Sequence, residues 1–344
     1  MRGILIDEAN IERYGPALES FHRDIADLHF EQTLDWCTCH AKHEGSFFVL
    51  TLDGEKITAS SLIRRRSVPV FGYATYRIER GPVCPDPSLL TEHLSHIVDL
   101  VREDGILLRV SPYYRDHTCN AVELDLRGDG WRPVASSLAP YKSTVVVNLA
   151  HGESVLKSEL RKSLRTQLNK GERLGIRVTD QPGPAELKAF IAQYNTMART
   201  RHLAAILPHM EACLQQWSQQ TPCKAKLITA EYRGEQVAGI VLLSAGNRVI
   251  YEWGASSDRN DHRQLPLTHI LHWHAILWAR ENGYRYYDFG GYWEARGDAD
   301  PINRFKTGFS KEIQRFVPEH VLLIKPLVAK CYLALARVKA GVSA

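Results

Sequence analysis

The segment R-F-K-T-G-F, residues 304 to 309, places Lys306 between two phenylalanines, close behind a pair of glycines. A lysine in this setting can pack at a strand edge, bind a phosphate, or stabilise negative charge that develops during a reaction. Its neighbour Phe305 offers a ring on which a nucleobase can stack, and Gly308 allows a close approach of the backbone. We therefore take Lys306 as the candidate catalytic cation, with Phe305 beside it.

Other polar and aromatic residues near this segment each have two interpretations. Asp288 ends an apolar strand just before the glycine pair, where it can orient an attacking amine or cap the following turn. Glu312 can pair with Lys306 or form a surface ion pair that contributes little. Tyr251 and Trp253 lie on the strand Y-E-W-G-A-S, where aromatic residues can line a groove but more often belong to the core. We keep Asp288 as a catalytic candidate, and the two aromatics as candidates for substrate binding.

The densest positive charge of the chain lies in residues 156 to 178. Leucines recur there every four residues, which predicts a single amphipathic helix over the whole segment. Its seven basic residues stand against Glu159 and Glu172, so the local charge is 7 − 2 = +5, whereas the whole chain carries +4. The segment is either a solvated connecting helix or a surface that follows phosphates. The basic residues are Lys157, Arg161, Lys162, Arg165, Lys170, Arg173 and Arg177.

Two parts of the chain repeat one pattern and must position these residues. Residues 48 to 63 and 227 to 242 both read as an apolar strand, a Gly-Glu turn and a second apolar strand, at an offset of 180 residues. Residues 96 to 110 resemble residues 275 to 289 at an offset of 178. Two matches in one order at nearly one offset indicate a duplicated domain, because the period is far too long for a solenoid.

Each copy predicts the same order of elements, namely a hairpin, a further strand, an amphipathic helix and a last strand. The helices are expected to end at Gly105 and Gly283, each in the position that often closes a helix. This order is that of the acyltransferase fold called GNAT. We predict an α/β protein of two tandem GNAT-like domains, with mixed sheets and flanking helices. The expected boundaries are 1–155 for the first domain, 156–178 for the basic connecting helix, and 179–344 for the second domain with a C-terminal helix over 326–340.

The composition fits this expectation. The 344 residues are 44% hydrophobic and 24% charged, which is typical of a globular protein of two domains. No uncharged apolar run reaches about 18 residues, so we expect no transmembrane segment. The seven cysteines are odd in number and scattered, which argues for reduced thiols and a cytoplasmic location. His269, His272 and His274 crowd one helix without a convergent acidic or cysteine motif, so we expect no metal.

The C-terminal part of the chain resembles the FemABX peptidyltransferases. The run W-A-R-E-N-G-Y-R-Y-Y-D-F-G-G (278 to 291), followed by R-F-K-T-G-F and Glu312, is similar to the signature of that family. F-E-Q-T-L-D-W (30 to 36) and R-G-P-V (80 to 83) match weaker motifs, and no long coiled-coil insertion is present. The resemblance implies two GNAT-like domains and transfer of an amino acid from aminoacyl-tRNA, as co-substrate without a further cofactor, to an amine of a peptide acceptor.

The resemblance also implies roles for particular residues. Lys306 would stabilise the oxyanion near the tRNA terminus, and Phe305 would stack on the terminal adenine. The basic segment would bind the tRNA backbone. The implied tRNA-binding residues are Arg304, Phe305, Lys306, Lys157, Arg161, Lys162, Arg165, Lys170 and Arg173; the implied acceptor-binding residues are Trp36, His40, Lys42, Arg199, Tyr251 and Trp253.

The acceptor side departs from the family pattern in three places. His40 stands where the family usually has a lysine, Ser111-Pro112 replaces the frequent D-P, and Leu203 stands where a tyrosine is usual after the arginine. The resemblance favours a peptidoglycan precursor stem peptide as acceptor. A peptide antibiotic intermediate is the alternative that would explain the departures.

Two other functions compete with this interpretation. An ordinary GNAT N-acyltransferase would use acyl-CoA, but residues 258 to 266 contain no glycine to cradle a pyrophosphate. A non-catalytic RNA-binding module would suit the basic segment and leave R-F-K-T-G-F unexplained. We expect a monomer, and the helix over 326–340, apolar on one side and basic on the other, also suits shallow contact with an anionic membrane.

Overall fold

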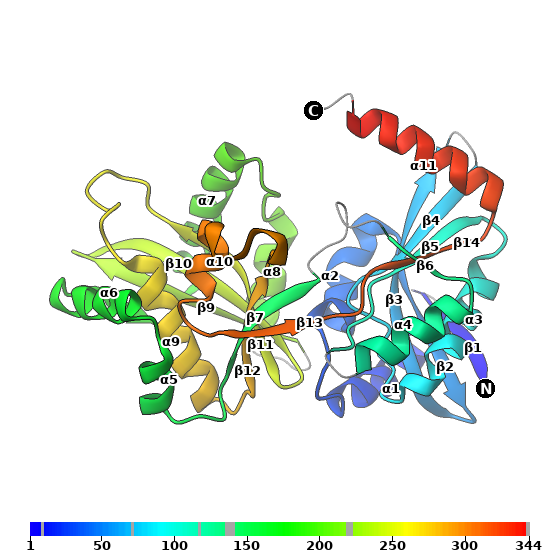
Figure 1. Cartoon of the computed structure of the whole chain (residues 1–344), viewed down its shortest axis with the longest axis horizontal. Helices are drawn as coiled ribbons and strands as arrows, with labels where there is room; N and C mark the ends of the chain where they lie inside the picture. The colour runs from blue at the N-terminus through cyan, green and yellow to red at the C-terminus, as the bar shows by residue number, and fades with distance from the viewer. Residues whose placement is uncertain (8–9, 70–71, 116–117, 135–141, 218–222, 342–344) are drawn as a thin grey trace. The chain divides into compact units, whose positions relative to one another are not determined.

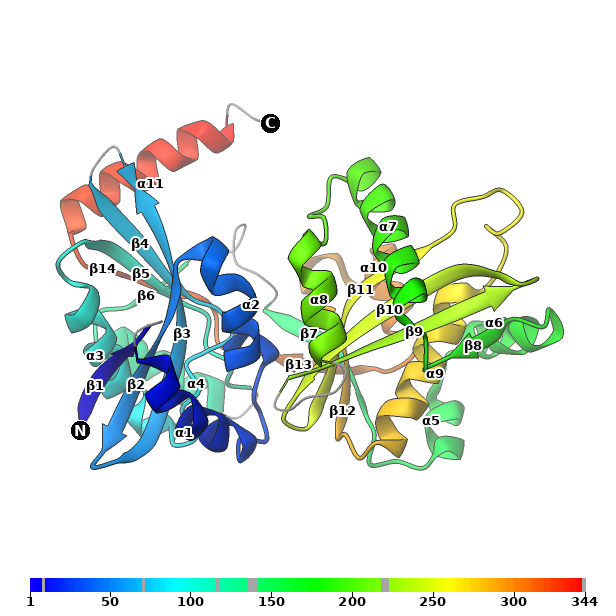
Figure 2. The ribbon, with the colours of Figure 1, turned by 180° about the vertical axis from the view of Figure 1, so that it is seen from behind.

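The computed structural model describes residues 1–7, 10–69, 72–115, 118–134, 142–217 and 223–341, with the side chains of residues 40–44 and 337–341 outside the description. The chain divides into two compact units, each built on a seven-stranded sheet (Figures 1 and 2). The first unit is Met1–Lys142 together with Arg315–Ala344, and the second is Ser143–Gln314. The predicted α/β architecture with mixed sheets and flanking helices is confirmed.

The sheet of the first unit has the strand order β1-β2-β3-β4-β5-β14-β6. All neighbouring pairs are antiparallel except β4 and β5, which run parallel. A row of buried apolar side chains on these strands packs against α3 and α4. The strands are β1 (Arg2–Ile6), β2 (Ser46–Asp53), β3 (Lys56–Val68), β4 (Tyr73–Ile78), β5 (Gly105–Val110), β6 (Arg132–Pro133) and β14 (His320–Leu323); the helices are α1 (Ile11–Arg23), α2 (Leu34–Glu44), α3 (Leu90–Val101), α4 (Cys119–Gly128) and α11 (Pro326–Gly341).

The sheet of the second unit has the order β13-β7-β12-β11-β10-β9-β8, with β11 and β12 as its parallel pair. Its core lies between the sheet and the helices α5, α6 and α9. The strands are β7 (Ser143–Asn148), β8 (Arg177–Thr179), β9 (Lys224–Tyr232), β10 (Glu235–Ala245), β11 (Arg248–Ser256), β12 (Tyr286–Gly291) and β13 (Glu312–Arg315); the helices are α5 (Glu153–Glu159), α6 (Lys162–Arg173), α7 (Pro184–Arg201), α8 (Pro208–Trp217), α9 (Leu267–Glu281) and α10 (Pro301–Lys306).

The two sheets share one topology, which confirms the repeat. In each, a hairpin is followed by an antiparallel strand, a crossover helix and a parallel strand: β2-β3-β4-α3-β5 in the first unit and β9-β10-β11-α9-β12 in the second. Gly283 follows α9 with φ 80°, as expected for a residue that closes a helix. Gly105 instead begins β5, where a Cβ would lie 2.5 Å from the carbonyl oxygen of Val101, so its role is close approach rather than capping.

The division of the chain differs from the predicted boundaries 1–155, 156–178 and 179–344. β7, expected in the first domain, pairs with β12 in the second sheet. β14, expected in the second domain, pairs with β5 in the first sheet. In each sheet, the strand next to the central parallel pair therefore comes from outside the repeat that forms the rest of that sheet. Domains made of one continuous stretch of chain cannot describe this pairing.

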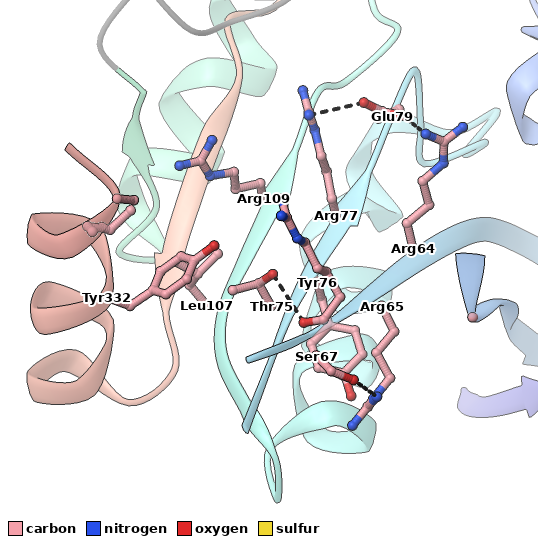
Figure 3. Close-up of a pocket in the computed structure, with 14 residues that line it drawn as sticks. Arg64, Arg65, Ser67, Thr75, Tyr76, Arg77, Glu79, Leu107, Arg109 and Tyr332 are labelled. Carbon is pink, nitrogen blue, oxygen red and sulfur yellow. Dashed lines mark hydrogen bonds and ion pairs between the residues drawn. The ribbon is translucent and has the colours of Figure 1, made fainter. Parts of the chain in front are cut away.

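The C-terminal helix was assigned to the wrong domain. α11 packs on the face of the first sheet, with Ala329 fully buried against Val68, Ile106 and Leu107. Figure 3 shows Tyr332 of α11 beside Leu107 of β5. The burial of these apolar side chains holds the helix on the first unit.

The basic segment 156–178 is also not one helix. Leu160 and Arg161 adopt extended backbone, with ψ 139° at both residues, and separate α5 from α6. Leu156, Leu160, Leu164 and Leu168 are nevertheless all buried in the core of the second unit. The predicted apolar stripe is thus real, although it spans two helices and the segment is part of the second unit rather than a connector.

The two weaker sequence motifs meet through Gln32. The side-chain amide of Gln32 donates to the carbonyl oxygen of Glu79 at 2.5 Å, and its oxygen accepts from the backbone N–H of Leu62 at 2.8 Å. A Cβ on Gly81 would lie 2.6 Å from this side chain, so glycine is required there. F-x-Q and R-G-P-V therefore form one structural contact in the first unit.

Two predictions about the whole chain can be compared with the structure, namely the lack of a transmembrane segment and the reduced state of the cysteines. No helix in the described ranges combines the length and apolar character that a bilayer crossing requires. Five of the seven cysteines are free thiols, and Cys39 and Cys213 are the exceptions, so the expectation that every thiol is reduced does not hold for these two. The free thiols are Cys37, Cys84, Cys119, Cys223 and Cys331.

Candidate active site

The site forms where the central parallel strands of the second unit stop pairing. β11 and β12 are partners only from Arg248 opposite Tyr286 to Ile250 opposite Asp288. The pairing of β12 with β7 becomes irregular at the same level, between Asp288 and Gly291. Backbone groups at the end of β12 are therefore free to bind other partners.

Lys306 is held at this point by a short helix. Asp300 caps α10 by accepting from the backbone N–H of Ile302 at 2.8 Å and of Asn303 at 3.1 Å, and Pro301 occupies the first turn. Lys306 is the last residue of the helix, and its side chain is only 9% exposed. Its Nζ donates to the carbonyl oxygen of Gly291 at 2.6 Å. The second residue of the glycine pair and the lysine are thus in direct contact.

The ammonium group of Lys306 is electrostatically unusual. Burial lowers its pKa to about 8, against the opposing effect of the negative charges of Asp288 and Asp300. An ammonium with a pKa near neutrality is a stronger hydrogen-bond donor than an ordinary lysine, and it still carries its proton at pH 7 in most molecules. Such a group can stabilise an oxyanion at close range.

An aromatic cluster surrounds Phe305. Its ring lies 5.2 Å from that of His269, 5.4 Å from that of His272 and 5.3 Å from that of Phe309. Burial lowers the pKa of His272 to about 3, so this imidazole is neutral, and its Nδ1 is 2.7 Å from the hydroxyl of Tyr287. The cluster fixes the orientation of Phe305, while the residue itself stays half-buried.

A cavity of about 280 Å³ opens beside this cluster. Arg161 and Arg304 supply its positive charge, and Phe305 and His269 supply aromatic surface. The break between α5 and α6 places Arg161 here, because its backbone N–H donates to the carbonyl oxygen of Gly308 at 2.9 Å and its Nη1 to that of Arg304 at 3.0 Å. The combination of two guanidinium groups and a ring suits a phosphate next to a base.

The remaining basic residues of the segment fall into two groups. Arg165 donates to the carbonyl oxygen of Ser158 at 2.8 Å, and Lys170 donates to that of Gln264 at 2.8 Å, so both stabilise the fold locally. Lys157, Lys162, Arg173 and Arg177 are exposed. Among the basic residues of the segment, all of which the structure describes, Arg161 is the one that lines the cavity with Arg304.

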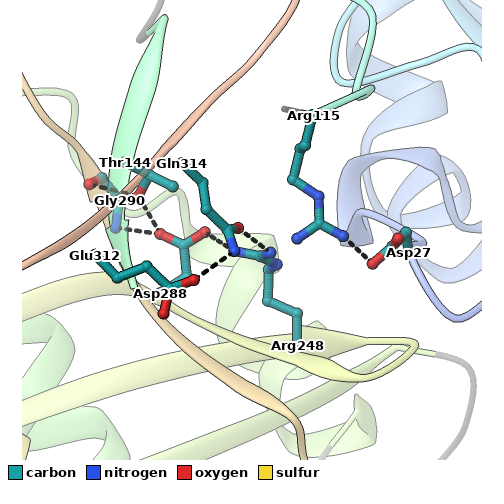
Figure 4. Close-up of polar contacts among 8 residues, drawn as sticks. All are labelled: Asp27, Arg115, Thr144, Arg248, Asp288, Gly290, Glu312 and Gln314. Atoms are coloured by element: carbon teal, nitrogen blue, oxygen red, sulfur yellow. Dashed lines mark hydrogen bonds and ion pairs between the residues drawn. The ribbon is translucent and has the colours of Figure 1, made fainter. Parts of the chain in front are cut away.

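Asp288 lies in a buried ion pair (Figure 4). Its Oδ2 accepts from Nη1 of Arg248 at 2.7 Å, and its Oδ1 accepts from the backbone N–H of Gly290 at 2.8 Å and from the hydroxyl of Thr144. Arg248 also donates to Oε1 of Gln314 at 2.6 Å. With both carboxylate oxygens engaged, Asp288 shapes the turn at the glycine pair and acts on Lys306 through its charge.

The predicted acceptor residues are not gathered in one place. Trp36 is buried in the first unit, with its ring 4.9 Å from that of Phe30. The side chains of His40 and Lys42 lie outside the described residues. In the second unit Arg199 is exposed on α7, and its guanidinium donates to Thr196 at 3.3 Å.

Tyr251 and Trp253 are half-buried on β11. Burial raises the pKa of Tyr251 to about 12, with further effects from the charges of Tyr194, Glu252 and Arg201. The ring of Tyr251 lies 4.6 Å from that of His272, so it joins the aromatic cluster. Arg201, two residues beyond the predicted Arg199, is therefore the α7 arginine whose charge acts on this tyrosine.

Several residues of the site were not predicted. Arg248, Thr144 and Gln314 come from three strands to form the Asp288 network, and Tyr194 of α7 approaches β11. The sequence did contain one signal for Arg248, which is its position at the start of an apolar strand. A charged side chain in such a strand requires a buried partner. Among the described residues, no group of three or more His, Cys, Asp or Glu side chains is arranged to hold a metal ion.

Comparison with known proteins agrees with this geometry. A model of the acetyltransferase (GNAT) domain matches residues 158–307, within the second unit. The structure of FemX superposes with a TM-score of 0.79 at 14% sequence identity, covering 96% of this chain and 99% of that one. The chain has the tandem GNAT fold of FemX. The predicted resemblance to the FemABX proteins is confirmed.

Other relatives extend the comparison. The lipid II:glycine glycyltransferase of Staphylococcus haemolyticus (strain JCSC1435) is 33% identical over 85 residues, which is 25% of this chain and 20% of the relative. The chain thus matches only about a fifth of the length of that relative. A tandem GNAT protein from the clavulanic acid biosynthesis pathway has the same Fem-like fold at a TM-score of 0.53 and 10% identity, covering 94% of this chain and 99% of that one.

Proposed function

We propose that this protein is an aminoacyltransferase that moves an amino acid from aminoacyl-tRNA to an amine of a peptide acceptor. The observation that carries the proposal is the cavity lined by Arg161, Arg304 and Phe305, the last of which directly precedes the buried Lys306 in α10. An RNA 3′ end presents a base, a phosphate and an ester close together. The ring of Phe305 can stack on the base, and the guanidinium groups of Arg161 and Arg304 can bind the phosphate. The ammonium group of Lys306, the next residue after Phe305, can donate to the ester carbonyl.

The proposed reaction needs little more than positioning and charge. The acceptor nitrogen attacks the ester carbonyl carbon, the C–N bond forms, and the C–O bond to the ribose breaks. The proton lost by the attacking nitrogen goes to the departing ribose oxygen. Negative charge on the carbonyl oxygen is stabilised by Nζ of Lys306, and an amine with a pKa around 7.7–8.0 is already partly neutral at pH 7.

The names of the relatives support one acceptor class. The curated relatives are glycyltransferases that act on lipid II by their names, which favours a peptidoglycan precursor stem peptide. The alternative acceptor is a peptide antibiotic intermediate. Both present a primary amine on a peptide, so both fit the same chemistry.

Transfer from a total pool of charged tRNA to candidate peptide acceptors tests the proposal, with product read by mass gain. We expect incorporation that is abolished by RNase and unaffected by acetyl-CoA. Phe305→Leu keeps apolar contact in the aromatic cluster and removes the ring; it should weaken tRNA binding by about 1–3 kcal/mol. Incorporation that survives RNase would contradict the proposal.

Arg161→Gln tests the phosphate contact, and Lys188→Gln on the exposed face of α7 is its matched control. Arg161→Gln should raise the KM for aminoacyl-tRNA and reduce its salt dependence, because a phosphate contact is lost. Lys188→Gln should change neither. If the two substitutions have equal effects, Arg161 contributes through the overall positive charge of the protein and not through a direct phosphate contact.

Acyl-CoA as donor is the second candidate, since the matched domain model is that of acetyltransferases. Two features argue against it. Lys170 binds the carbonyl oxygen of Gln264 in the loop before α9, and a Cβ on Gly171 would lie 2.0 Å from Cδ1 of Ile270, so α6 lies directly against the start of α9. That loop and helix start are where a GNAT enzyme would hold the pyrophosphate. Acetylation of the same acceptor without RNA would favour this candidate.

A further inference from the structure

A cavity of about 420 Å³ lies in the second unit, between the sheet and the helices α7 and α8. Figures 1 and 2 show α9 on one face of this sheet and α7 and α8 on the other. Among the residues that the structure describes, this cavity shares none of its lining with the cavity of Arg161 and Phe305. It is therefore separate from the site of the proposed transfer.

The walls of this cavity are mostly apolar. Leu187 of α7, Leu214 of α8 and Val241 of β10 are buried, and each of them lines the cavity. Ala225 and Leu227 of β9 complete the apolar lining, and Leu227 is only half-buried. An apolar space of this size beside a partly exposed strand can take up aliphatic side chains of a ligand.

The cavity lies where β9 has a partner strand on only one side. β8 pairs with β9 only from Arg177 opposite Glu231 to Thr179 opposite Thr229. Residues 224–228 of β9 pair with β10, and within the described ranges no strand lies on their other side. Alternate backbone N–H and C=O groups of an antiparallel strand point away from its partner, so this stretch presents unpaired groups at the edge of the sheet.

The segment 180–184, which follows β8 along the chain, does not continue the pairing with β9. Two of its residues are prolines, which have no backbone N–H group. The backbone N–H of Gln181 donates to Oγ1 of Thr179 at 3.2 Å, and that of Gly183 donates to Oε2 of Glu186 at 2.9 Å. Residues 181–184 therefore have no backbone donor left for β9.

The charges along this edge favour an acidic ligand. Lys226 contacts Asp180 at 3.7 Å, and its Nζ lies 5.3 Å from the centre of the Trp278 ring on α9. Lys224 is exposed, and in the described part of the chain it forms no ion pair. Lysines on an edge strand discourage indiscriminate pairing with other strands. A strand that carries a carboxylate opposite Lys224 removes this obstacle, because opposite charges on neighbouring strands attract.

We propose that this edge of β9 binds an extended peptide as an additional antiparallel strand. Backbone hydrogen bonds to residues 224–228 hold the peptide, and its alternate side chains provide specificity. Residues directly opposite each other on paired strands have their side chains on the same face. The peptide residues opposite Leu227 and Ala225 therefore enter the cavity and are aliphatic, and the residue opposite Lys224 is acidic. In the direction of β8, the ligand reads aliphatic, any residue, aliphatic, acidic.

Calorimetric titration of the full chain with the acetylated and amidated peptide Thr-Val-Thr-Val-Glu, at up to millimolar concentration, tests the proposal. We expect saturable binding, with the two valines in the cavity. The peptide Val-Thr-Val-Thr-Glu has the same composition, but it can place its valines in the cavity only by moving its glutamate away from Lys224. This second peptide should therefore bind more weakly.

Two substitutions examine the cavity and the charge separately. Ala225→Leu fills part of the cavity and should weaken binding at least tenfold, while the thermal unfolding midpoint stays unchanged or rises. Lys224→Gln should weaken binding about two- to fivefold, as expected for an exposed ion pair. Lys330→Gln, at an exposed lysine of α11 in the first unit, is the matched control and should bind the peptide as the wild type does.

Failure of Thr-Val-Thr-Val-Glu to bind the folded wild-type protein would overturn the proposal. Equal binding of the two peptides would also overturn it, because the cavity would then take up valine without strand pairing in register. Unchanged binding by folded Ala225→Leu would place the peptide elsewhere on the protein. A dimer in analytical ultracentrifugation that Ala225→Leu dissociates would make the occupant a second copy of this chain instead. None of these outcomes depends on transferase activity.

Discussion

Lys306 should impose a characteristic pH dependence on transfer. With a pKa of about 8, about nine in ten molecules carry the proton at pH 7 and about one in ten at pH 9. If the ammonium group stabilises the oxyanion, kcat/KM must fall as the pH rises through about 8. A general base at the same position would give the opposite slope, because its active form is the neutral amine.

Three substitutions separate charge, shape and proton transfer. Lys306→Ala and Lys306→Met remove the donor, and loss of one oxyanion donor typically costs about 10²–10³ in rate. Lys306→Arg keeps a charge at every accessible pH, so its residual activity should lose the alkaline fall. Met fills the same volume as Lys, so agreement between the Ala and Met variants excludes an effect of the space left behind.

The assay is transfer of a radiolabelled amino acid from charged tRNA between pH 6 and pH 10. Spontaneous ester hydrolysis is subtracted at each pH, and circular dichroism confirms folding. The acceptor amine contributes its own acid limb, which all variants share and which therefore serves as an internal reference. A rate that rises to a plateau above pH 8, or an alkaline fall that persists unchanged in Lys306→Arg, would refute the role of Lys306 as a cation.

Three further predictions concern stability and are measured by chemical denaturation. The pKa of Lys306 is lower in the folded than in the unfolded state, so the unfolded chain binds more protons between pH about 8 and 10.5. The free energy of unfolding should therefore rise with pH in that window. The Lys306→Met variant should lack this pH dependence and should be more stable than the wild type at pH 7. Arg248→Met leaves the 3% exposed Asp288 with an unpaired charge and should cost about 3–5 kcal/mol, whereas a loss below about 1 kcal/mol would show that the ion pair contributes little. Gln32→Ala leaves the backbone N–H of Leu62 without its acceptor in a buried site and should cost about 1–3 kcal/mol, and an unchanged midpoint would mean that water replaces the amide.

The parts of the fold that the sequence predicted are those encoded in local patterns. Alternating apolar residues around the Gly54 and Gly234 turns define the two hairpins, and both exist as β2-β3 and β9-β10. The leucine stripe of residues 156 to 168 is buried as expected. Its division into α5 and α6 was not predictable from the stripe, because the leucines remain on one side of the segment across the extended pair Leu160 and Arg161.

The sequence indicated those residues of the candidate site that lie close together in the chain. It did not indicate the residues that distant strands bring to the site. Phe305 and Lys306 are adjacent in the sequence, and Gly291 is only 15 residues away. The turn-capping alternative for Asp288 is confirmed by its contact with the backbone N–H of Gly290, whereas its contacts with Arg248, 40 residues distant, and Thr144, 144 residues distant, were not predicted. No local pattern indicates such pairs, since they depend on which strands become neighbours.

The exchange of strands between repeats determines how a cavity of the first unit and the candidate active site of the second unit are built. β14 lies beside β5 and is followed at once by α11, which supplies the apolar wall of a cavity in the first unit. The candidate active site is completed in the same way, because Thr144 of β7 binds Asp288 at the end of β12. In each unit the strand that comes from outside the repeat therefore lies next to the parallel strand whose end forms the cavity or site. A duplicated domain that kept its own last strand would position neither β7 beside Asp288 nor α11 over Leu107, so both arrangements depend on the exchange.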